Sequence, residues 1–428
     1  MKYAITTLGC KVNQYETAAL EKLLAERGFS PTADGDADVV IINTCAVTAE
    51  SGRKSRQAIR RMKNENPGAP VAVCGCFSQV EPDEIRSLGA DIVFGSGDKH
   101  GLVSALEELL CERHSSVVSI DDPFKRRYFE PLPSGAVEHR TRAMLKIQDG
   151  CDNFCTYCII PYARGRVRSL PPEEAVKEAS RLNAEGFREL VLTGIEIASY
   201  GKDLRDGSSL VSVTESVIEA APDARIRLGS LEPTVITEEF CERLSKTGRL
   251  CRHFHLSLQS GSDGVLSRMN RKYDTAFFYE RVELLRKWFP GCGLTADLIT
   301  GFPGETDSEH AETLEFIKKC GFSQMHIFPY SIRPGTKAAE MTPQIPKAEK
   351  SRRAHEAQLV ADGMRDEFLR SCIGQTLSVL FETDGAEHSV GHADNYCEVS
   401  VPPARLHGLV RNVKIIDVSG QMLVGLVV

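Results

Sequence analysis

The stretch from Gly150 to Arg168 reads GCDNFCTYCIIPYARGRVR, and it carries Cys151, Cys155 and Cys158 in a C-x3-C-x2-C spacing. A structural zinc site uses four protein ligands, and an ordinary [4Fe–4S] electron carrier uses four thiolates. Three thiolates on one short loop therefore predict a metal centre with one corner open to a substrate or cosubstrate. The alternative, three core cysteines in a reduced protein, gives no reason for them to cluster on one loop.

This spacing resembles the signature of the radical S-adenosylmethionine (SAM) enzymes, and Tyr157 stands where that superfamily usually has an aromatic residue. The resemblance implies that the three cysteines hold a [4Fe–4S] cluster whose fourth iron is chelated by SAM. The flanking segments narrow this resemblance to the methylthiotransferase branch of the superfamily. They read Lys-Ile-Gln-Asp-Gly at 146–150 and Ile-Ile-Pro-Tyr-Ala-Arg-Gly at 159–165.

The bulk composition limits the classes of protein that fit. A chain of 428 residues predicts two or three domains. Its net charge of −7, from 59 acidic and 52 basic side chains, does not indicate a nucleic-acid protein overall, so RNA contacts would need local basic patches. No apolar run is long enough to span a membrane, and the N-terminus resembles a strand rather than a signal peptide. We therefore expect a cytoplasmic protein whose fourteen cysteines are reduced or bind metal.

The first segment, residues 1–114, alternates apolar strands with amphipathic helices, which predicts a doubly wound parallel sheet. We expect strands at 2–7, 39–42, 71–73 and 91–94. Cysteines follow three of these strands: Cys10, Cys45, and Cys74 with Cys76. The carboxyl ends of parallel strands line one crevice, so these thiols predict a second three-thiolate site. Buried apolar cysteines are the alternative.

Three motifs around these cysteines resemble those of the methylthiotransferase N-terminal domain. They read TLGCKVNQYE at 7–16, NTCAVT at 43–48 and GCFSQ at 75–79. The resemblance implies a second [4Fe–4S] cluster held by Cys10, Cys45 and Cys76. Cys74 is interpreted as a core residue that could still be a rival ligand. The Lys-Val-Asn-Gln-Tyr-Glu segment favours the subfamily that acts on threonylcarbamoyladenosine in tRNA.

Basic residues gather at 51–63, where the sequence has Arg53, Lys54, Arg56, Arg60, Arg61 and Lys63. They form either a solvated helix face or a phosphate-binding strip, and the sequence favours neither. Residues 115–140 contain proline, carry Lys-Arg-Arg at 125–127 and lack periodicity, which predicts a linker.

A second alternation of strands and helices runs through residues 141–370. Six expected strands, at 143–148, 189–193, 225–229, 253–258, 293–299 and 324–328, predict a partial (β/α)6 barrel. Polar or glycine-rich turns follow each strand, at the end of a barrel where catalytic loops lie. These turns also resemble the methylthiotransferase barrel, which implies a SAM-facing rim formed by Glu196, Ser230, Glu232 and Gln259.

The last segment, residues 371–428, has short β-branched runs separated by turns, which predicts a small β-barrel. Its place and size resemble the RNA-binding TRAM module. Yet the segment from Cys372 onward holds six acidic residues against three basic ones, so an electrostatic grip on RNA is doubtful. A packing module against the central barrel is the alternative.

The resemblance covers nearly the whole chain and implies a tRNA methylthiotransferase acting on N6-threonylcarbamoyladenosine next to the anticodon. It further implies two [4Fe–4S] clusters, SAM, and an electron donor such as a flavodoxin or ferredoxin. One cluster cleaves SAM to a radical that takes hydrogen from adenine C2, and the other supplies sulfur. The alternatives are methylthiolation of another tRNA adenosine or of a ribosomal-protein aspartate, and a non-catalytic iron–sulfur protein that binds RNA or transfers electrons.

Overall fold

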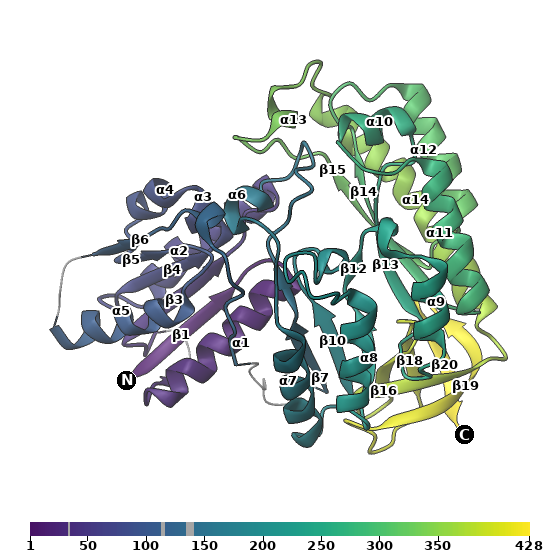
Figure 1. The fold of residues 1–428 in the computed structure, drawn as a ribbon, viewed down its shortest axis with the longest axis horizontal. Helices are drawn as coiled ribbons and strands as arrows, with labels where there is room; N and C mark the ends of the chain where they lie inside the picture. Colours follow the sequence, from purple (N-terminus) through teal and green to yellow (C-terminus); the bar gives the residue numbers. More distant parts are fainter. Residues whose placement is uncertain (33–34, 113–115, 134–140) are drawn as a thin grey trace.

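A computed structural model describes residues 1–32, 35–112, 116–133 and 141–428, and its chain forms three consecutive parts (Figure 1). The first part is a six-stranded parallel sheet in the order β2-β1-β3-β4-β5-β6. Its strands are β1 (Lys2–Thr7), β2 (Ser30–Pro31), β3 (Val39–Thr44), β4 (Val71–Gly75), β5 (Ile92–Phe94) and β6 (Val117–Ser119). This arrangement confirms the predicted doubly wound fold.

Helices cover both faces of this sheet because its strand residues point alternately to two separate cores. Tyr3 and Ile41 pack with α1 (Lys11–Glu26) and α5 (Lys99–Glu112) on one face. On the other face, Val40 and Ile42 pack with residues of α2 (Ala49–Glu65), α3 (Cys76–Val80) and α4 (Pro82–Ser87).

The two edge strands of this sheet were not predicted. β2 has two residues and β6 has three, so neither is long enough to show a period-two pattern. β6 lies inside the segment expected to be a linker, so that expectation is wrong for residues 117–119. Residues 134–140 of the expected linker lie outside the described residues.

The second part is a partial barrel of parallel strands, as predicted. Its two sheets, β11-β10-β7 and β12-β13-β14-β15, follow one another because only Gly229 separates β11 from β12. The strands are β7 (Arg142–Lys146), β10 (Glu189–Thr193), β11 (Arg225–Leu228), β12 (Ser230–Leu231), β13 (His253–Gln259), β14 (Gly293–Thr300) and β15 (Gln324–Pro329). The outer helices are α7 (Pro172–Ala184), α8 (Leu210–Ala220), α9 (Glu238–Ser245), α11 (Thr275–Trp288) and α12 (Asp307–Cys320).

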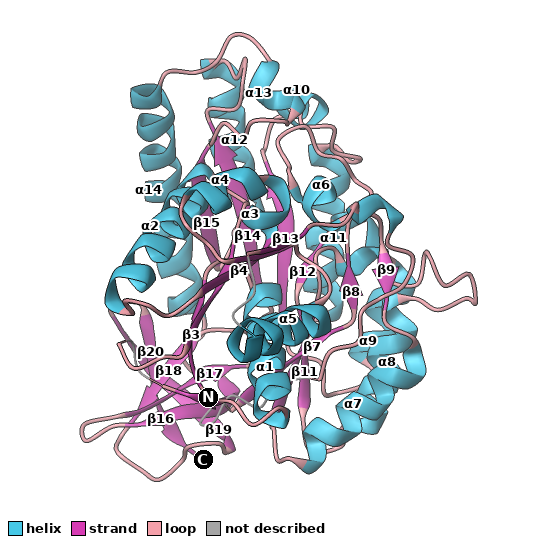
Figure 2. Cartoon of the chain, turned by 90° about the vertical axis from the view of Figure 1, so that its left-hand side faces the viewer, coloured by secondary structure: helices cyan, strands magenta, loops and turns pink. Residues whose placement is uncertain are grey.

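This barrel leaves β7 and β15 as unpaired edges, and the N-terminal part contacts both of them. On the β7 side, Lys146 pairs with Glu16 of α1 at 3.2 Å. Just after β15, the Ser331 hydroxyl accepts a hydrogen bond of 2.9 Å from the backbone N–H of Ala49, where α2 begins. The N-terminal sheet therefore closes the open side of the barrel, as Figure 2 also shows.

The third part follows the long helix α14 (Lys347–Ser371) and is a closed five-stranded barrel in the order β16-β17-β18-β20-β19. Its strands are β16 (Thr376–Asp384), β17 (Ser389–Ala393), β18 (Glu398–Val401), β19 (Val410–Ser419) and β20 (Met422–Val427). Of these, β17 was not predicted. No helix among the described residues is long and apolar enough to cross a membrane.

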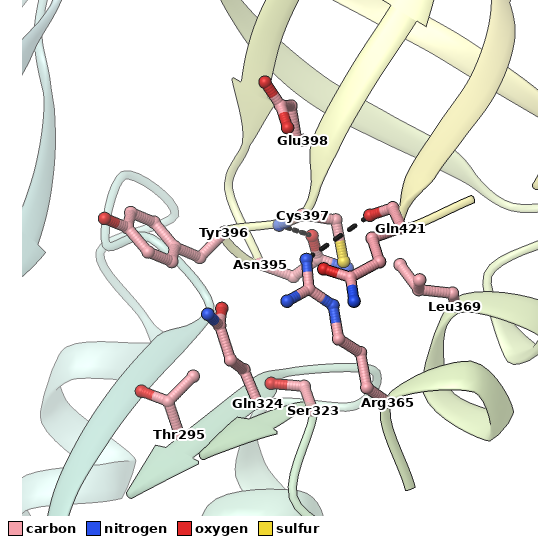
Figure 3. A pocket seen from close by; sticks show the side chains of 10 residues that line it. All are labelled: Thr295, Ser323, Gln324, Arg365, Leu369, Asn395, Tyr396, Cys397, Glu398 and Gln421. Carbon is pink, nitrogen blue, oxygen red and sulfur yellow. Dashed lines mark hydrogen bonds between the residues drawn. The ribbon is translucent and has the colours of Figure 1, made fainter. Parts of the chain in front are cut away.

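The small barrel packs against the amino ends of the central strands. Arg225 donates a 2.8 Å hydrogen bond to the carbonyl of Ser378, Arg252 pairs with Asp394 at 2.7 Å, and Arg142 pairs with Glu382 at 2.6 Å. A cavity of about 20 Å³, lined in part by Gln324, Arg365 and Tyr396, lies within this interface (Figure 3). It has room for about one water molecule.

A buried group of charges joins the N-terminal part to the central barrel. Arg164 of α6 (Ile160–Arg164) and Glu16 of α1 are 0% and 1% exposed, and the guanidinium donates two hydrogen bonds to the carboxylate. Lys146 and Lys99 also lie within 4.0 Å of Glu16. Burial raises the pKa of Glu16, but the three cations outweigh burial and lower it to about 2.

We expect Arg164→Ala to lower the free energy of unfolding by about 3–5 kcal/mol, because it leaves the Glu16 carboxylate buried without its closest partner. Arg53→Ala is the matched control, because Arg53 pairs with Glu50 on the surface with both side chains about half exposed. That change is expected to leave the free energy of unfolding nearly unchanged, because solvent screens exposed ion pairs. Urea unfolding monitored by circular dichroism would measure both, and equal effects would contradict the prediction.

Candidate active site

The first cysteine triad lies on the loop between β8 (Gln148–Asp149) and α6. Gly150 opens the loop with φ +76°, and a Cβ there would lie 1.9 Å from the carbonyl oxygen of Arg166, so only glycine fits. The backbone N–H of Cys151 then donates to the carbonyl of Gly165 at 3.0 Å. A cavity of about 140 Å³ borders Cys155 and Cys158. The loop thus presents thiols beside open space.

The second triad forms where β1, β3 and β4 end, as the sequence predicted for a parallel sheet. Gly9 packs against Cys45, since a Cβ at Gly9 would lie 2.8 Å from the Cys45 sulfur. Burial raises the pKa of the Cys76 thiol to about 12; Arg164 opposes this rise, and Cys45 and Cys10 add to it. Cys10, Cys45 and Cys76 therefore influence one another across three different loops.

Cys74 has different surroundings from Cys76, although only Gly75 separates them. Cys74 packs in the core beside α1 and α5, whereas Cys76 belongs to the core on the opposite face of the sheet. The left-handed φ of Gly75, +102°, reverses the chain between them. A Cβ at Gly75 would lie 2.5 Å from the carbonyl oxygen of Thr44. Cys74 thus has the position of a core residue.

The two triads lie close to each other. Burial and then Cys155 raise the pKa of Cys158 to about 12. Cys76 of the N-terminal part adds to this rise. The remaining described cysteines, Cys241, Cys251, Cys292, Cys320, Cys372 and Cys397, are buried in the central and C-terminal parts. Two sets of three thiols, each grouped at one place in the fold, fit two clusters with open corners.

Each triad has one arginine that donates a hydrogen bond to a thiol sulfur. Nε of Arg164 lies 3.1 Å from Sγ of Cys76, and Nη1 of Arg271 lies 3.2 Å from Sγ of Cys155. Hydrogen bonds to ligand sulfurs stabilise thiolates and tune the reduction potential of a cluster. Sequence reasoning assigned neither arginine this role. Arg164 stands in a quoted motif, but nothing local marks Arg271.

Two of the predicted rim residues, Glu196 and Glu232, contact one further side chain. Asn153, which was not predicted, donates to Glu196 at 2.9 Å and to Glu232 at 3.2 Å, and so joins these two. Burial and then Glu232 raise the pKa of Glu196 to about 7. Ser230 is exposed at the start of β12, and Gln259 ends β13 with φ +70°. Tyr157 packs edge-on against Phe302, 6.5 Å between ring centroids. Contacts of these residues with SAM stay a prediction.

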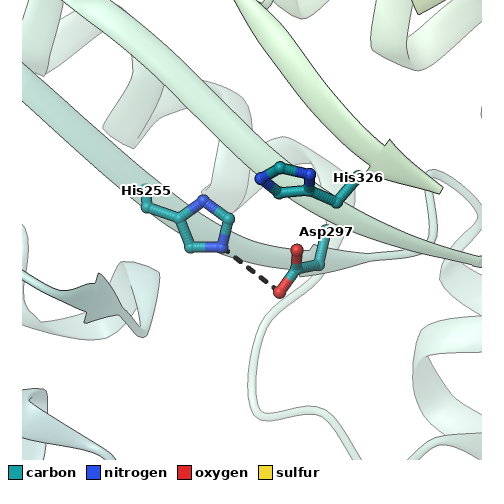
Figure 4. Close-up of side chains that lie close together, drawn as sticks. All are labelled: His255, Asp297 and His326. Carbon is teal, nitrogen blue, oxygen red and sulfur yellow. Dashed lines mark ion pairs between the residues drawn. The ribbon is translucent and has the colours of Figure 1, made fainter. Parts of the chain in front are cut away.

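A further polar cluster lies on the inner side of the barrel strands. His255, Asp297 and His326 come from β13, β14 and β15, and their side chains point toward one another (Figure 4). Nε2 of His255 lies 3.2 Å from the Asp297 carboxylate, and its Nδ1 lies 2.9 Å from the Thr295 hydroxyl. Sequence reasoning searched the loops and so missed these strand residues.

The basic residues of α2 are largely committed to other partners. Arg53, Arg56 and Arg61 pair with acidic residues, and Lys63 donates to the carbonyl of Gly89. Arg126 of the expected linker pairs with Asp121. Among the basic residues of this helix, Lys54 and Arg60 are the two whose side chains form no hydrogen bond or ion pair with a described residue. The helix therefore offers less free positive charge than its sequence suggests.

Two known families match this chain, one over its N-terminal part and one over its central barrel. Residues 145–317 match the Radical SAM superfamily, and residues 2–95 match the Uncharacterized protein family UPF0004. Two solved structures share the fold. Radical S-adenosylmethionine methyltransferase TsrM from Kitasatospora setae aligns at a TM-score of 0.57 and 17% identity, over 79% of this chain and 77% of that one. The radical enzyme OxsB aligns at 0.53 and 12% identity, over 84% and 56%.

Proteins that match by sequence are more similar to this chain than these solved structures are. Threonylcarbamoyladenosine tRNA methylthiotransferase MtaB of Bacillus subtilis is 42% identical over 92% of this chain and 89% of its own. The Thermotoga maritima protein of the same name is 39% identical over 88% and 86%. The tRNA-2-methylthio-N(6)-dimethylallyladenosine synthase of Pelotomaculum thermopropionicum is 35% identical over 89% and 86%. With these matches along nearly its whole length, the chain belongs to the radical SAM methylthiotransferase family.

Proposed function

We propose that this protein converts N6-threonylcarbamoyladenosine next to the anticodon of tRNA to its 2-methylthio derivative. Relatives named for this reaction match most of the chain at up to 42% identity. The observation that carries the proposal is the pair of thiol triads on facing parts of the chain, where Nε of Arg164, just after the barrel triad, lies 3.1 Å from Sγ of Cys76. Sulfur insertion needs both a site that activates a C–H bond and a nearby site that holds sulfur.

The cofactors of this activity are two [4Fe–4S] clusters and SAM. Cys151, Cys155 and Cys158 would hold the cluster that binds SAM, and Cys10, Cys45 and Cys76 would hold the second. When bound, the first cluster and SAM supply the one-electron chemistry that an unactivated adenine C–H requires. Arg271 and Arg164 donate hydrogen bonds to ligand sulfurs, and Asn153 holds Glu196 and Glu232 together at the rim.

Further partners follow from this activity. The substrate places the protein with tRNA in the cytoplasm. The reaction also needs an external one-electron donor of low potential, such as a flavodoxin or ferredoxin. The C-terminal barrel fits the TRAM module, and its observed contacts are with the central barrel.

Deleting the gene is expected to remove 2-methylthio-N6-threonylcarbamoyladenosine from total tRNA and to leave its unthiolated precursor in its place. Mass spectrometry of tRNA nucleosides measures both, and the wild-type chain, but not Cys151→Ala, should restore the product. Loss of the dimethylallyl product instead would favour the activity of the P. thermopropionicum relative. No change in either nucleoside would favour a protein substrate or a non-catalytic role.

Anaerobically reconstituted protein is expected to hold about eight irons as two clusters. Replacing Cys151, Cys155 and Cys158 together by alanine should leave about four, and so should replacing Cys10, Cys45 and Cys76. Iron and sulfide analysis with Mössbauer spectroscopy measures this. An unchanged count in either triple variant would contradict that ligand set.

Cys76→Ala is expected to abolish methylthiolation while SAM is still cleaved under reducing conditions, because only the second cluster loses a ligand. Cys74→Ala is the matched control two residues away, and it should keep methylthiolation with a stability loss of about 1–2 kcal/mol from the core. Product analysis and 5′-deoxyadenosine release from the same reactions distinguish them. Exchanged phenotypes would identify Cys74 as the ligand.

A further inference from the structure

A cavity of about 470 Å³ opens inside the partial barrel, and all three parts of the chain line it. Lys11 and Gln14 come from α1, Met144 and Arg227 from barrel strands, and Tyr396 from the C-terminal barrel. This volume lies within the range of small-molecule sites. Lys11 directly follows Cys10, so the cavity adjoins the second cysteine triad.

The other cations lining this cavity are already paired with carboxylates. Arg227 donates hydrogen bonds of 2.7 and 3.0 Å to Glu189, and Arg142 pairs with Glu382 at 2.6 Å. The Lys11 side chain is exposed and has no hydrogen bond or ion pair with any described residue. Among the described residues that line the cavity, Lys11 is therefore the cation without a carboxylate partner.

The start of α1 adds to this positive charge. Lys11 is the first residue of this sixteen-residue helix, and its N-cap, Cys10, accepts no side-chain hydrogen bond from the first turn. No acidic residue lies in that turn. Unpaired N–H groups and the helix dipole make such an end favourable for an anion. Because Lys11 is itself the first residue of the helix, its ammonium and the positive helix end have the same sign and lie close together.

Lys11 also faces the inner wall of the barrel. Burial is the main cause that lowers the pKa of His326. Asp297 raises this pKa, whereas His255 and then the charge of Lys11 lower it further. The only carboxylate of the His255–Asp297–His326 cluster, Asp297, is already paired with His255. A neighbouring fixed cation disfavours a metal ion at this cluster, so an anionic ligand suits the cavity better.

We propose that Lys11, with the N-terminal N–H groups of α1, binds the carboxylate of the threonylcarbamoyl group and thereby selects this substrate. The inference rests on the function proposed above. In adenine, C2 and the N6 substituent flank N1 on one edge of the ring. A base whose C2 approaches the cluster proposed at Cys10 can therefore extend its N6 substituent into the adjacent cavity that Lys11 lines. A dimethylallyl substituent carries no charge and gains nothing from Lys11.

Two anticodon stem-loop RNAs test the proposal, one with the free threonylcarbamoyl carboxylate and one with its methyl ester. A charged hydrogen bond lost on esterification should lower kcat/KM of the wild type about 10- to 100-fold. For Lys11→Ala, kcat/KM should fall by the same factor with the free acid and should not change with the ester. Lys11→Arg should recover most of the activity on the free acid, because it keeps the charge.

The controls separate recognition from cluster damage. Lys22→Ala removes another lysine of α1 and should leave kcat/KM unchanged with both RNAs. Iron content and SAM cleavage without RNA should be equal in the wild type and Lys11→Ala. The proposal is overturned if the wild type uses the ester as well as the free acid, or if Lys11→Ala lowers kcat/KM on both equally. A wild type that methylthiolates neither RNA would instead refute the proposed function.

Discussion

The buried contact between Arg164 and Glu16 is the constraint on which the rest of the site depends. Arg164 belongs to the cysteine loop of the barrel and Glu16 to the first helix of the N-terminal sheet, so their pairing sets how these parts meet. The same guanidinium donates to the Cys76 sulfur and to Asn13. Asn13 in turn donates to the carbonyls of Leu8 and Thr44, next to the other two motif cysteines. One side chain thus connects an inter-domain contact to the geometry of a metal site.

Burying so many charges is costly, and the arrangement persists because each has an opposite partner. Lys146 lies 3.2 Å from Glu16 and 2.8 Å from Asp149, which Arg164 and Arg168 also approach. Ion pairs of this kind contribute less to stability than apolar packing would, but they fix one relative orientation. That property matters here because two cysteine triads from separate parts must meet at a defined distance.

Sequence reasoning predicted the fold, and it could propose the cysteine ligands, because the signals for both are local. A C-x3-C-x2-C loop or a cysteine after a strand needs no knowledge of the rest of the chain. Arg271 was missed because its contact with Cys155 spans 116 residues. The sequence could not decide whether the basic residues of α2 are free, because the partner of Arg56, Glu84, lies on another helix. β6 was missed because three residues cannot show a period.

The adjacency of Cys10 and Lys11 has a consequence for how substrate choice can change over time. Consecutive Cα atoms lie about 3.8 Å apart whatever the fold does around them. The proposed sensor of the substituent, Lys11, and the proposed cluster ligand, Cys10, are therefore joined by one peptide unit and not by tertiary packing. New substituents can be accommodated by exchanging a single side chain, while the sulfur-bearing corner, the interface and the barrel stay as they are.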